Sequence, residues 1–280
     1  GIILGISAAT FAGQFAGSVV SYDSGTTPAE DWFTSASFDD PNSALGEPTN
    51  VIIDMFGTNL MSPFTPGSQI AQIVSVGEGG HLTLKLDNYV VVGPGLDIGV
   101  ITNVGLLDIA WPTGQCGNPA QVFGDDPATV EVSANGADWV SLGAVTFNMP
   151  ANYYANATAY NVDPPAGPQV ADFGKPFDPA GGLSAFDGLN FAGVLGVLDG
   201  SGGGTWLDLS PTGLTQVGYV RFSVADDGDP NNDANFEVDA VVIANGKVGD
   251  PVGAEPVPEP AAISLLALAG GLRLIRRRRT

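Results

Sequence analysis

Apolar and polar residues alternate in several short stretches of the chain, and these stretches mark its predicted strands. From His81 to Leu86 the leucines occupy every second position, so they face one way while His81 and the other polar residues face the opposite way. Residues 217–225 and 236–244 repeat this alternation with valine and phenylalanine on the apolar side. A period of two is typical of strands that bury one face. The pattern predicts three strands here, with His81 as the outward first residue of one.

Residues 129–142 predict the clearest local structure, a β-hairpin. Alternating residues flank Asn135-Gly136, a dipeptide that favours the positive φ angles of tight hairpin turns. The valines of the first strand are expected on the buried face. Trp139 is expected to provide a large apolar cap near them.

Glycine and proline are frequent, with 39 and 21 of the 280 residues, but they show no regular repeat. Such a composition fits short strands joined by turns. Residues 151–204 are expected to be mostly loop, with a short strand or helix near 189–198. The glycine run at 200–204 lacks the lysine of a phosphate-binding loop and is interpreted as a flexible connection. Many short strands and hardly any amphipathic helix predict an all-β fold, a β-sandwich with long loops.

Both ends of the chain differ in composition from its middle. Residues 1–17 are uncharged and, apart from Gln14, small or apolar, which indicates the apolar and cleavage regions of a secretory signal peptide, processed after Ala12 or Ala9. A buried first strand or helix is the alternative. Residues 248–260 are rich in proline, glycine and acid, as linkers are. The predicted parts are a signal remnant at 1–20, one β-sandwich domain at 21–247, the linker at 248–260, and an apolar helix with an arginine cluster at 261–280.

The apolar part of the C-terminal tail, residues 261–275, is short for a membrane anchor. Fifteen residues give about 22 Å of helix, whereas the bilayer core is about 30 Å thick and needs roughly 20 apolar residues. Arg273 also interrupts the apolar run. Arginines after an apolar helix stay on the cytoplasmic side of a membrane. The tail therefore predicts a transient membrane contact.

The end of the chain resembles a known sorting signal in three parts and in the right order. These parts are Val257-Pro258-Glu259-Pro260, then the apolar run, then Arg276, Arg277, Arg278 and Arg279, and together they resemble the PEP-CTERM signal. The resemblance implies recognition and cleavage by an exosortase in a bacterium that makes extracellular polysaccharide. It implies the export machinery as a partner, with localisation at the cell surface or extracellular matrix of a Gram-negative-type bacterium. An ordinary membrane anchor, or a buried helix with a basic end, is the alternative.

The charge of the chain is strongly one-sided. It has 30 acidic and 9 basic residues and a formal net charge of −21, and five of the basic residues lie in the tail. Such a surface repels nucleic acid and attracts cations, Ca²⁺ above all. The single cysteine, Cys116, excludes an intrachain disulfide, and the single histidine excludes multi-histidine zinc or iron sites. No common catalytic motif is present, so we expect no enzymatic activity.

An acidic segment before the last predicted strand is the candidate metal site. Side-chain oxygens recur at nearly every second position from residue 226 to residue 239. A Ca²⁺ ion with six to eight oxygen ligands would offset the repulsion among so many carboxylates. The pattern is not an EF-hand, so a second loop is expected to share the ion; a solvated acidic turn is the alternative. The candidate ligands are Asp226, Asp227, Asp229, Asn231, Asp233, Glu237 and Asp239, with Asp39 and Asp40 from the other loop.

Several short motifs between residues 20 and 245 resemble a second family. They include Val132-Ser-Ala-Asn-Gly-Ala-Asp-Trp139, Tyr219-Val-Arg-Phe222 and Phe236-Glu-Val-Asp-Ala-Val241, which are similar to pieces of discoidin-like, galactose-binding jelly-roll domains. The resemblance implies a jelly-roll β-sandwich, and in such domains a structural calcium ties the first loop to the last strand. Sugar rings stack on aromatic side chains. The candidate glycan contacts are Trp111, Trp206, Tyr153 and Tyr154.

Three functions are compatible with these features. The first is an exported structural or matrix protein without catalysis. The second is a carbohydrate-binding module that holds extracellular polysaccharide. The third and weakest is a glycoside hydrolase, which needs two carboxylates at a defined separation. A glycan array distinguishes the first two, and an open cleft with two carboxylates would favour the third.

Overall fold

The computed structural model describes residues 13–31, 34–54, 57–159, 163–226, 228 and 234–253. Strand makes up 39% of the described residues and helix 9%, so the predicted all-β class is confirmed. The strands are β1 (Ala16–Asp23), β2 (Val51–Asp54), β3 (Gly57–Leu60), β4 (Val74–Gly77), β5 (His81–Val91), β6 (Ile98–Ile101), β7 (Gly105–Leu106), β8 (Val122–Phe123), β9 (Pro127–Ser133), β10 (Val140–Thr146), β11 (Thr205–Leu207), β12 (Gln216–Ser223), β13 (Asn235–Val238), β14 (Ala240–Ile243) and β15 (Val248–Pro251). The helical segments are η1 (Pro41–Ala44), η2 (Gly182–Phe186), α1 (Phe191–Leu198) and η3 (Ser210–Thr212).

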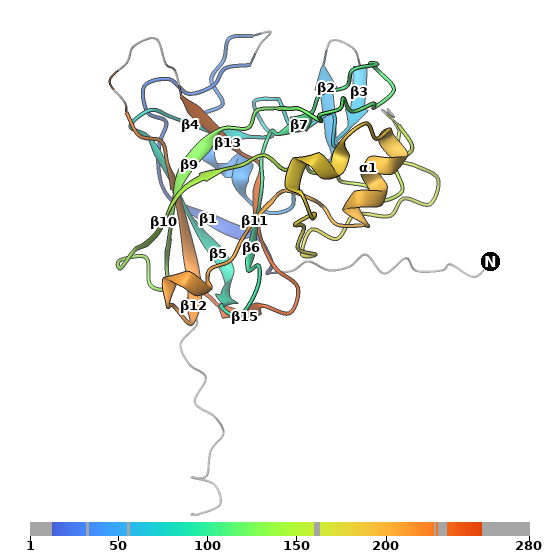
Figure 1. The fold of residues 1–280 in the computed structure, drawn as a ribbon. Helices are drawn as coiled ribbons and strands as arrows, with labels where there is room; N and C mark the ends of the chain where they lie inside the picture. The colour runs from blue at the N-terminus through green and yellow to red at the C-terminus, as the bar shows by residue number, and fades with distance from the viewer. Residues whose placement is uncertain are drawn as a thin grey trace, which may run out of the picture.

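Two layers of antiparallel strands form a sandwich (Figure 1). One layer is a six-stranded sheet in the order β1-β5-β12-β9-β10, with β15 also paired to β5. The other layer contains the β11-β6-β14 sheet and the β13-β4 pair. Their inner faces share one hydrophobic core, which includes Leu84, Phe222 and Val241. A jelly roll is a finer assignment of this sandwich, and it stays a prediction.

The alternation predicted for β5 and β12 is confirmed. The three leucines of β5 are fully buried, while His81 begins the strand, half-buried, with its Nε2 atom 3.1 Å from the Oγ atom of Ser21 on β1. Thr83 faces outward yet is only 1% exposed. Arg221 of β12 crosses the outer face of the sheet and donates a hydrogen bond to the Thr83 hydroxyl.

β9 and β10 form the predicted hairpin, with a longer turn than expected. Residues 134–139 separate the strands, and the Asn135 side-chain oxygen accepts two backbone N–H groups of the turn. Gly136 has the expected positive φ, +74°. Trp139 does not cap the core. It lies on the outer side, where the Arg221 guanidinium is 3.9 Å from the ring centre.

A second hydrophobic core lies on the far side of the β11-β6-β14 sheet. Neighbouring residues of β14 divide between the two cores, with Val241 in the first and Val242 in the second. The buried face of α1, carrying Phe191 and Val194, closes the second core. Figure 1 shows α1 beside the main sandwich and under the β2–β3 hairpin. The long segment before β11 thus packs into a second buried core together with residues of β3, β6 and β14.

The flexible connection predicted for the glycine run 200–204 is wrong. Four of its five residues are buried. A Cβ atom on Gly202 would lie 2.2 Å from the Phe173 ring, and one on Gly204 would lie 2.6 Å from Ile101. These residues are glycine because the backbone packs directly against side chains. The short strand or helix expected near 189–198 is the helix α1.

The folded part extends past both ends of the predicted range 21–247. β1 begins at Ala16, and Phe15 before it is already buried. β15 lies in the predicted linker and pairs with β5. Residues 1–12 and the predicted tail helix at 261–280 lie outside the described residues. Among the helices that the structure describes, none has the length and apolar character needed to span a bilayer.

Candidate functional site

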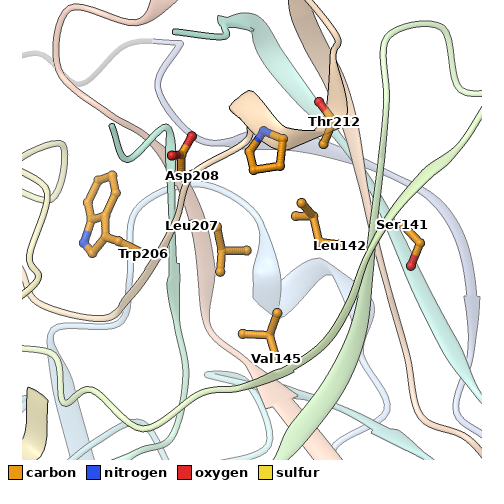
Figure 2. Close-up of a pocket in the computed structure, with 8 residues that line it drawn as sticks. Ser141, Leu142, Val145, Trp206, Leu207, Asp208 and Thr212 are labelled. Atoms are coloured by element: carbon orange, nitrogen blue, oxygen red, sulfur yellow. The ribbon is translucent and has the colours of Figure 1, made fainter. Parts of the chain in front are cut away.

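A pocket of about 380 Å³ opens between the edges of the two layers (Figure 2). β10 is the last strand of the six-stranded sheet and β11 the last strand of the three-stranded sheet. η3, which precedes β12, adds a third wall. The lining residues are Ser141, Leu142, Val145, Trp206, Leu207, Asp208, Pro211 and Thr212. The pocket is therefore the opening on one side of the sandwich.

Apolar side chains form the floor of the pocket. β10 pairs with β9 through an irregularity between Ser141 and Gly143, and Gly143 has a φ of +80°. This bulge adds Leu142 to the strand. Leu142, Val145 and Leu207 are partly buried and pack on the first core. Figure 2 shows these three side chains around one space.

The rim of the pocket is polar. Asp208 Oδ1 accepts the backbone N–H of Ser210 at 2.8 Å, and hydrogen bonds from Ser210 hold the pKa of Asp208 below its ordinary value. Thr212 donates its hydroxyl to the Leu209 carbonyl at 2.7 Å. Ser141 accepts a backbone N–H of the bulge. The pocket thus combines an apolar floor with a carboxylate and two hydroxyls, an arrangement suited to binding.

Trp206 forms part of the pocket wall, but its ring points away from the floor (Figure 2). The indole Nε1 atom donates to the Gly203 carbonyl at 3.0 Å. The ring packs over Gly99 of β6, where an added Cβ atom would lie 2.7 Å from it. Trp206 is 7% exposed, so its ring belongs to the second core.

The other candidate glycan contacts lie in different environments. Tyr153 and Tyr154 are buried in the second core, with ring centres 4.8 Å apart and an edge-to-face orientation. A buried ring has no free face for a sugar. Trp111 is 69% exposed and lies on a loop organised by Asp108, whose carboxylate accepts three backbone N–H groups. The structure does not bring Trp111 to the pocket.

Glu237 of β13 is a buried carboxylate that contacts β4 and the loop between β6 and β7. It is 2% exposed and lies opposite Ser75 of β4. The Ser75 hydroxyl and the Asn103 amide each donate a hydrogen bond of 3.0 Å to it. Burial raises the pKa of Glu237 from 4.5 to about 7, and the nearby charge of Asp126 adds to the shift.

Asp239 is the second buried carboxylate of this segment. It is 1% exposed, and both of its oxygens accept the backbone N–H of Thr49, at 3.1 and 3.3 Å. Burial raises the pKa of Asp239 from 3.8 to about 8, while the bond from Thr49 opposes the shift. This hydrogen bond ties the loop that follows η1 to the junction of β13 and β14.

Of the remaining candidate metal ligands, those that the structure describes do not join these two carboxylates. Asp39 and Asp226 are exposed. Asp40 is exposed too, and its carboxylate caps η1 by accepting the N–H of Asn42. Asp227, Asp229, Asn231 and Asp233 lie outside the described residues. Within the described ranges, no three acidic, histidine or cysteine side chains are grouped so as to hold an ion, so the described donors do not form a calcium cage.

The comparisons with known proteins give no family. Neither the scan against protein-family models nor the search of curated proteins returns a match for this chain. The eight predicted sorting-signal residues, at 257–260 and 276–279, lie outside the described part of the chain. The pocket is the feature that the sequence did not predict, because its floor depends on a bulge and its walls come from segments about 60 residues apart.

Proposed function

We propose that this chain is an exported, non-catalytic protein of the cell surface or extracellular matrix. The observation that carries the proposal is the C-terminal order of Val257-Pro258-Glu259-Pro260, apolar run and arginine cluster. A sandwich with two hydrophobic cores supports it, because a domain of this kind can stay folded outside the cell without a disulfide. Exosortase and the export machinery would be its processing partners.

The mass of the mature protein from its native host tests this proposal. Removal of both ends would leave a chain that starts near Gly13, just before buried Phe15, and stops near Pro260. Surface fractionation of the same cells should recover this form outside the inner membrane. A full-length chain that retains residues 261–280 in the inner membrane would contradict sorting and favour an ordinary anchor.

Calcium-assisted stability is part of the proposal and rests on the oxygen-rich sequence 226–239. The two buried carboxylates, Glu237 and Asp239, lack a basic partner among the described ion pairs. The remaining ligands of the ion would come from the other candidates of this segment, Asp226, Asp227, Asp229, Asn231 and Asp233. Differential scanning calorimetry should show a lower melting temperature in chelator than in millimolar Ca²⁺. An identical melting temperature in both conditions would exclude a structural calcium.

A second candidate function, holding extracellular polysaccharide, is favoured by the pocket between β10 and β11. Its size and its apolar floor with a polar rim fit a small-molecule site. Among its lining residues Asp208 is the single carboxylate, whereas glycoside hydrolysis uses two. Retention on immobilised polysaccharide tests this function, and unchanged glycan chain lengths after incubation would separate binding from hydrolysis.

A further inference from the structure

The hydrogen-bonding groups on the rim of the pocket are mostly acceptors. Asp208 uses one oxygen to accept the Ser210 N–H and keeps further lone pairs toward solvent. The Thr212 hydroxyl donates its proton to the Leu209 carbonyl and accepts the backbone N–H of Leu214 at 3.2 Å, so toward a ligand it can only accept, through its remaining lone pair. A ligand that satisfies this rim has to bring several donors of its own.

The apolar floor of the pocket favours a ligand that also has an apolar surface. Leu142, Val145 and Leu207 are partly exposed apolar side chains that face one space (Figure 2). The ring of Pro211 adds a further apolar surface at the side. Contact with these groups is favourable for a flat C–H surface. The pocket therefore suits a molecule with one apolar face and hydroxyl groups around its edge.

The charge near the pocket excludes anionic ligands. Hydrogen bonds from Ser210 lower the pKa of Asp208 and so favour its carboxylate form, and the whole chain is strongly acidic. The nearest basic side chain that acts on Asp208 is Lys247. That ammonium group is already bound to the buried carboxylate of Asp97. A uronate, phosphate or sulfate at the rim would meet a like charge, and no residue that lines the pocket is basic.

We propose that the pocket between β10 and β11 binds an uncharged sugar unit of a polysaccharide. The C–H face of the sugar ring lies on Leu142, Val145 and Leu207, and its hydroxyls donate to Asp208 and Thr212. Acidic sugars are rejected by Asp208. This inference rests on the polysaccharide-holding function proposed above and adds the site and the sugar class to it.

Affinity electrophoresis with three soluble probes tests the inference: dextran, galactomannan and the polyuronate alginate. The unmodified protein should be retarded by at least one of the two neutral glycans and not by alginate. Asp208→Ala should weaken retardation by about 10-fold or more, because a hydrogen bond to a charged group is lost. Asp178→Asn is the matched control, since Asp178 is an exposed aspartate outside the pocket. It should behave like the unmodified protein.

A floor variant provides independent evidence. Leu142→Asp places a second carboxylate in the space that the sugar ring would occupy, and it should abolish retardation by neutral glycans. Melting curves show whether the variant is folded. If it does not fold, Pro211→Asp on the exposed side of the pocket replaces it.

Each possible result is decisive. Stronger retardation by alginate than by the neutral glycans overturns the sugar class. Glycan binding that survives Asp208→Ala and the floor variant overturns the site but leaves the polysaccharide-holding function intact. No retardation by any probe overturns this inference together with that function, while export and sorting remain to be judged by the mass of the mature protein.

Discussion

Two regions of this sandwich bury carboxylates almost completely, and the partners of these carboxylates differ between the regions. At the start of β6, Asp97 is fully buried and paired with Lys247. At the end of β13, Glu237 and Asp239 are as deeply buried and have neutral hydrogen-bond donors only. Of the four carboxylates that the described residues bury, Asp97 has a basic partner, whereas Glu237 and Asp239 have none; the fourth, Glu78, is 6% exposed.

The Asp97 site resembles a small cation cage with an ammonium group at its centre. The Lys247 Nζ atom donates to the carbonyls of Gly93, Pro94 and Gly95 at 3.1 to 3.2 Å and to the Asp97 carboxylate. The second oxygen of Asp97 accepts the N–H of Leu209. Both charges thus have hydrogen-bond partners. The site connects the loop before β6, the turn between β14 and β15, and the segment between β11 and η3.

Glu237 and Asp239 lack such a partner, and the difference appears in their proton affinity. Burial disfavours a charge that no cation offsets, so the pKa values of Glu237 and Asp239 rise to about 7 and about 8. A proton or a bound cation can relieve this cost. The same burial is thus accompanied by an ion pair at Asp97 and by raised pKa values at Glu237 and Asp239.

The largest effect is expected from removing the lysine. Lys247→Met leaves Asp97 buried without its counter-charge, which typically costs about 3–5 kcal/mol of unfolding free energy. Urea unfolding at pH 7 measures the loss. The double variant Asp97→Asn/Lys247→Met should recover much of it, since no unpaired charge remains. Equal stabilities of the single and double variants would show that the ion pair is not what Lys247 contributes.

Asp239→Asn should raise the free energy of unfolding, whereas Lys247→Met lowers it. Between the unfolded pKa near 3.8 and the folded value of about 8, the folded state keeps a proton that the unfolded state has lost. Stability therefore falls as pH rises through this window. The variant removes this fall and should be more stable than the unmodified protein by about 2–4 kcal/mol at pH 8.5, with little difference at pH 4.

Urea titrations in chelator at pH 4, 6 and 8.5 measure this dependence, with Asp178→Asn as the control for the change in net charge. Parallel pH profiles for Asp239→Asn and the control would refute the role of burial. The same titrations are repeated in millimolar Ca²⁺ to test whether the ion compensates the charge of Asp239. If the ion compensates Asp239, the advantage of the variant at high pH should disappear in calcium.

The sequence predicted features that depend on near neighbours and missed those that depend on distant ones. β5, β12 and the β9–β10 hairpin follow from local alternation and from Asn135-Gly136, and all three are present. The composition of the glycine run 200–204 is that of a linker, and only its contact with Phe173 shows why glycine is required there. Composition alone does not distinguish a flexible linker from a glycine run that packs against a buried side chain.

The same limit applies to the candidate sites. Tyr153 and Tyr154 have the chemistry of sugar contacts, but the second core that buries them is assembled from segments far apart in sequence. Asp97 and Lys247 are 150 residues apart, so no spacing rule links them. The sequence also did not predict the burial of Glu237 and Asp239, because both lie on the polar side of an alternating strand, the side that is usually exposed.

The smallest effect is expected from Glu237→Gln, and it tests whether neutral donors alone can hold a buried acid. The folded pKa of Glu237, about 7, lies closer to its unfolded value of 4.5 than that of Asp239 does to its own. Stability lost as pH rises from 4.5 to 7 should therefore be smaller, and the variant should gain about 1–2 kcal/mol at pH 8. Asp126→Asn should lower the pKa of Glu237, because it removes the nearby charge that raises it. Urea unfolding at pH 8 measures the stability gain of Glu237→Gln, and nuclear magnetic resonance titration of the Glu237 carboxyl carbon measures the pKa change in Asp126→Asn. A pKa that does not respond to Asp126→Asn would mean that desolvation alone sets the proton affinity of this site.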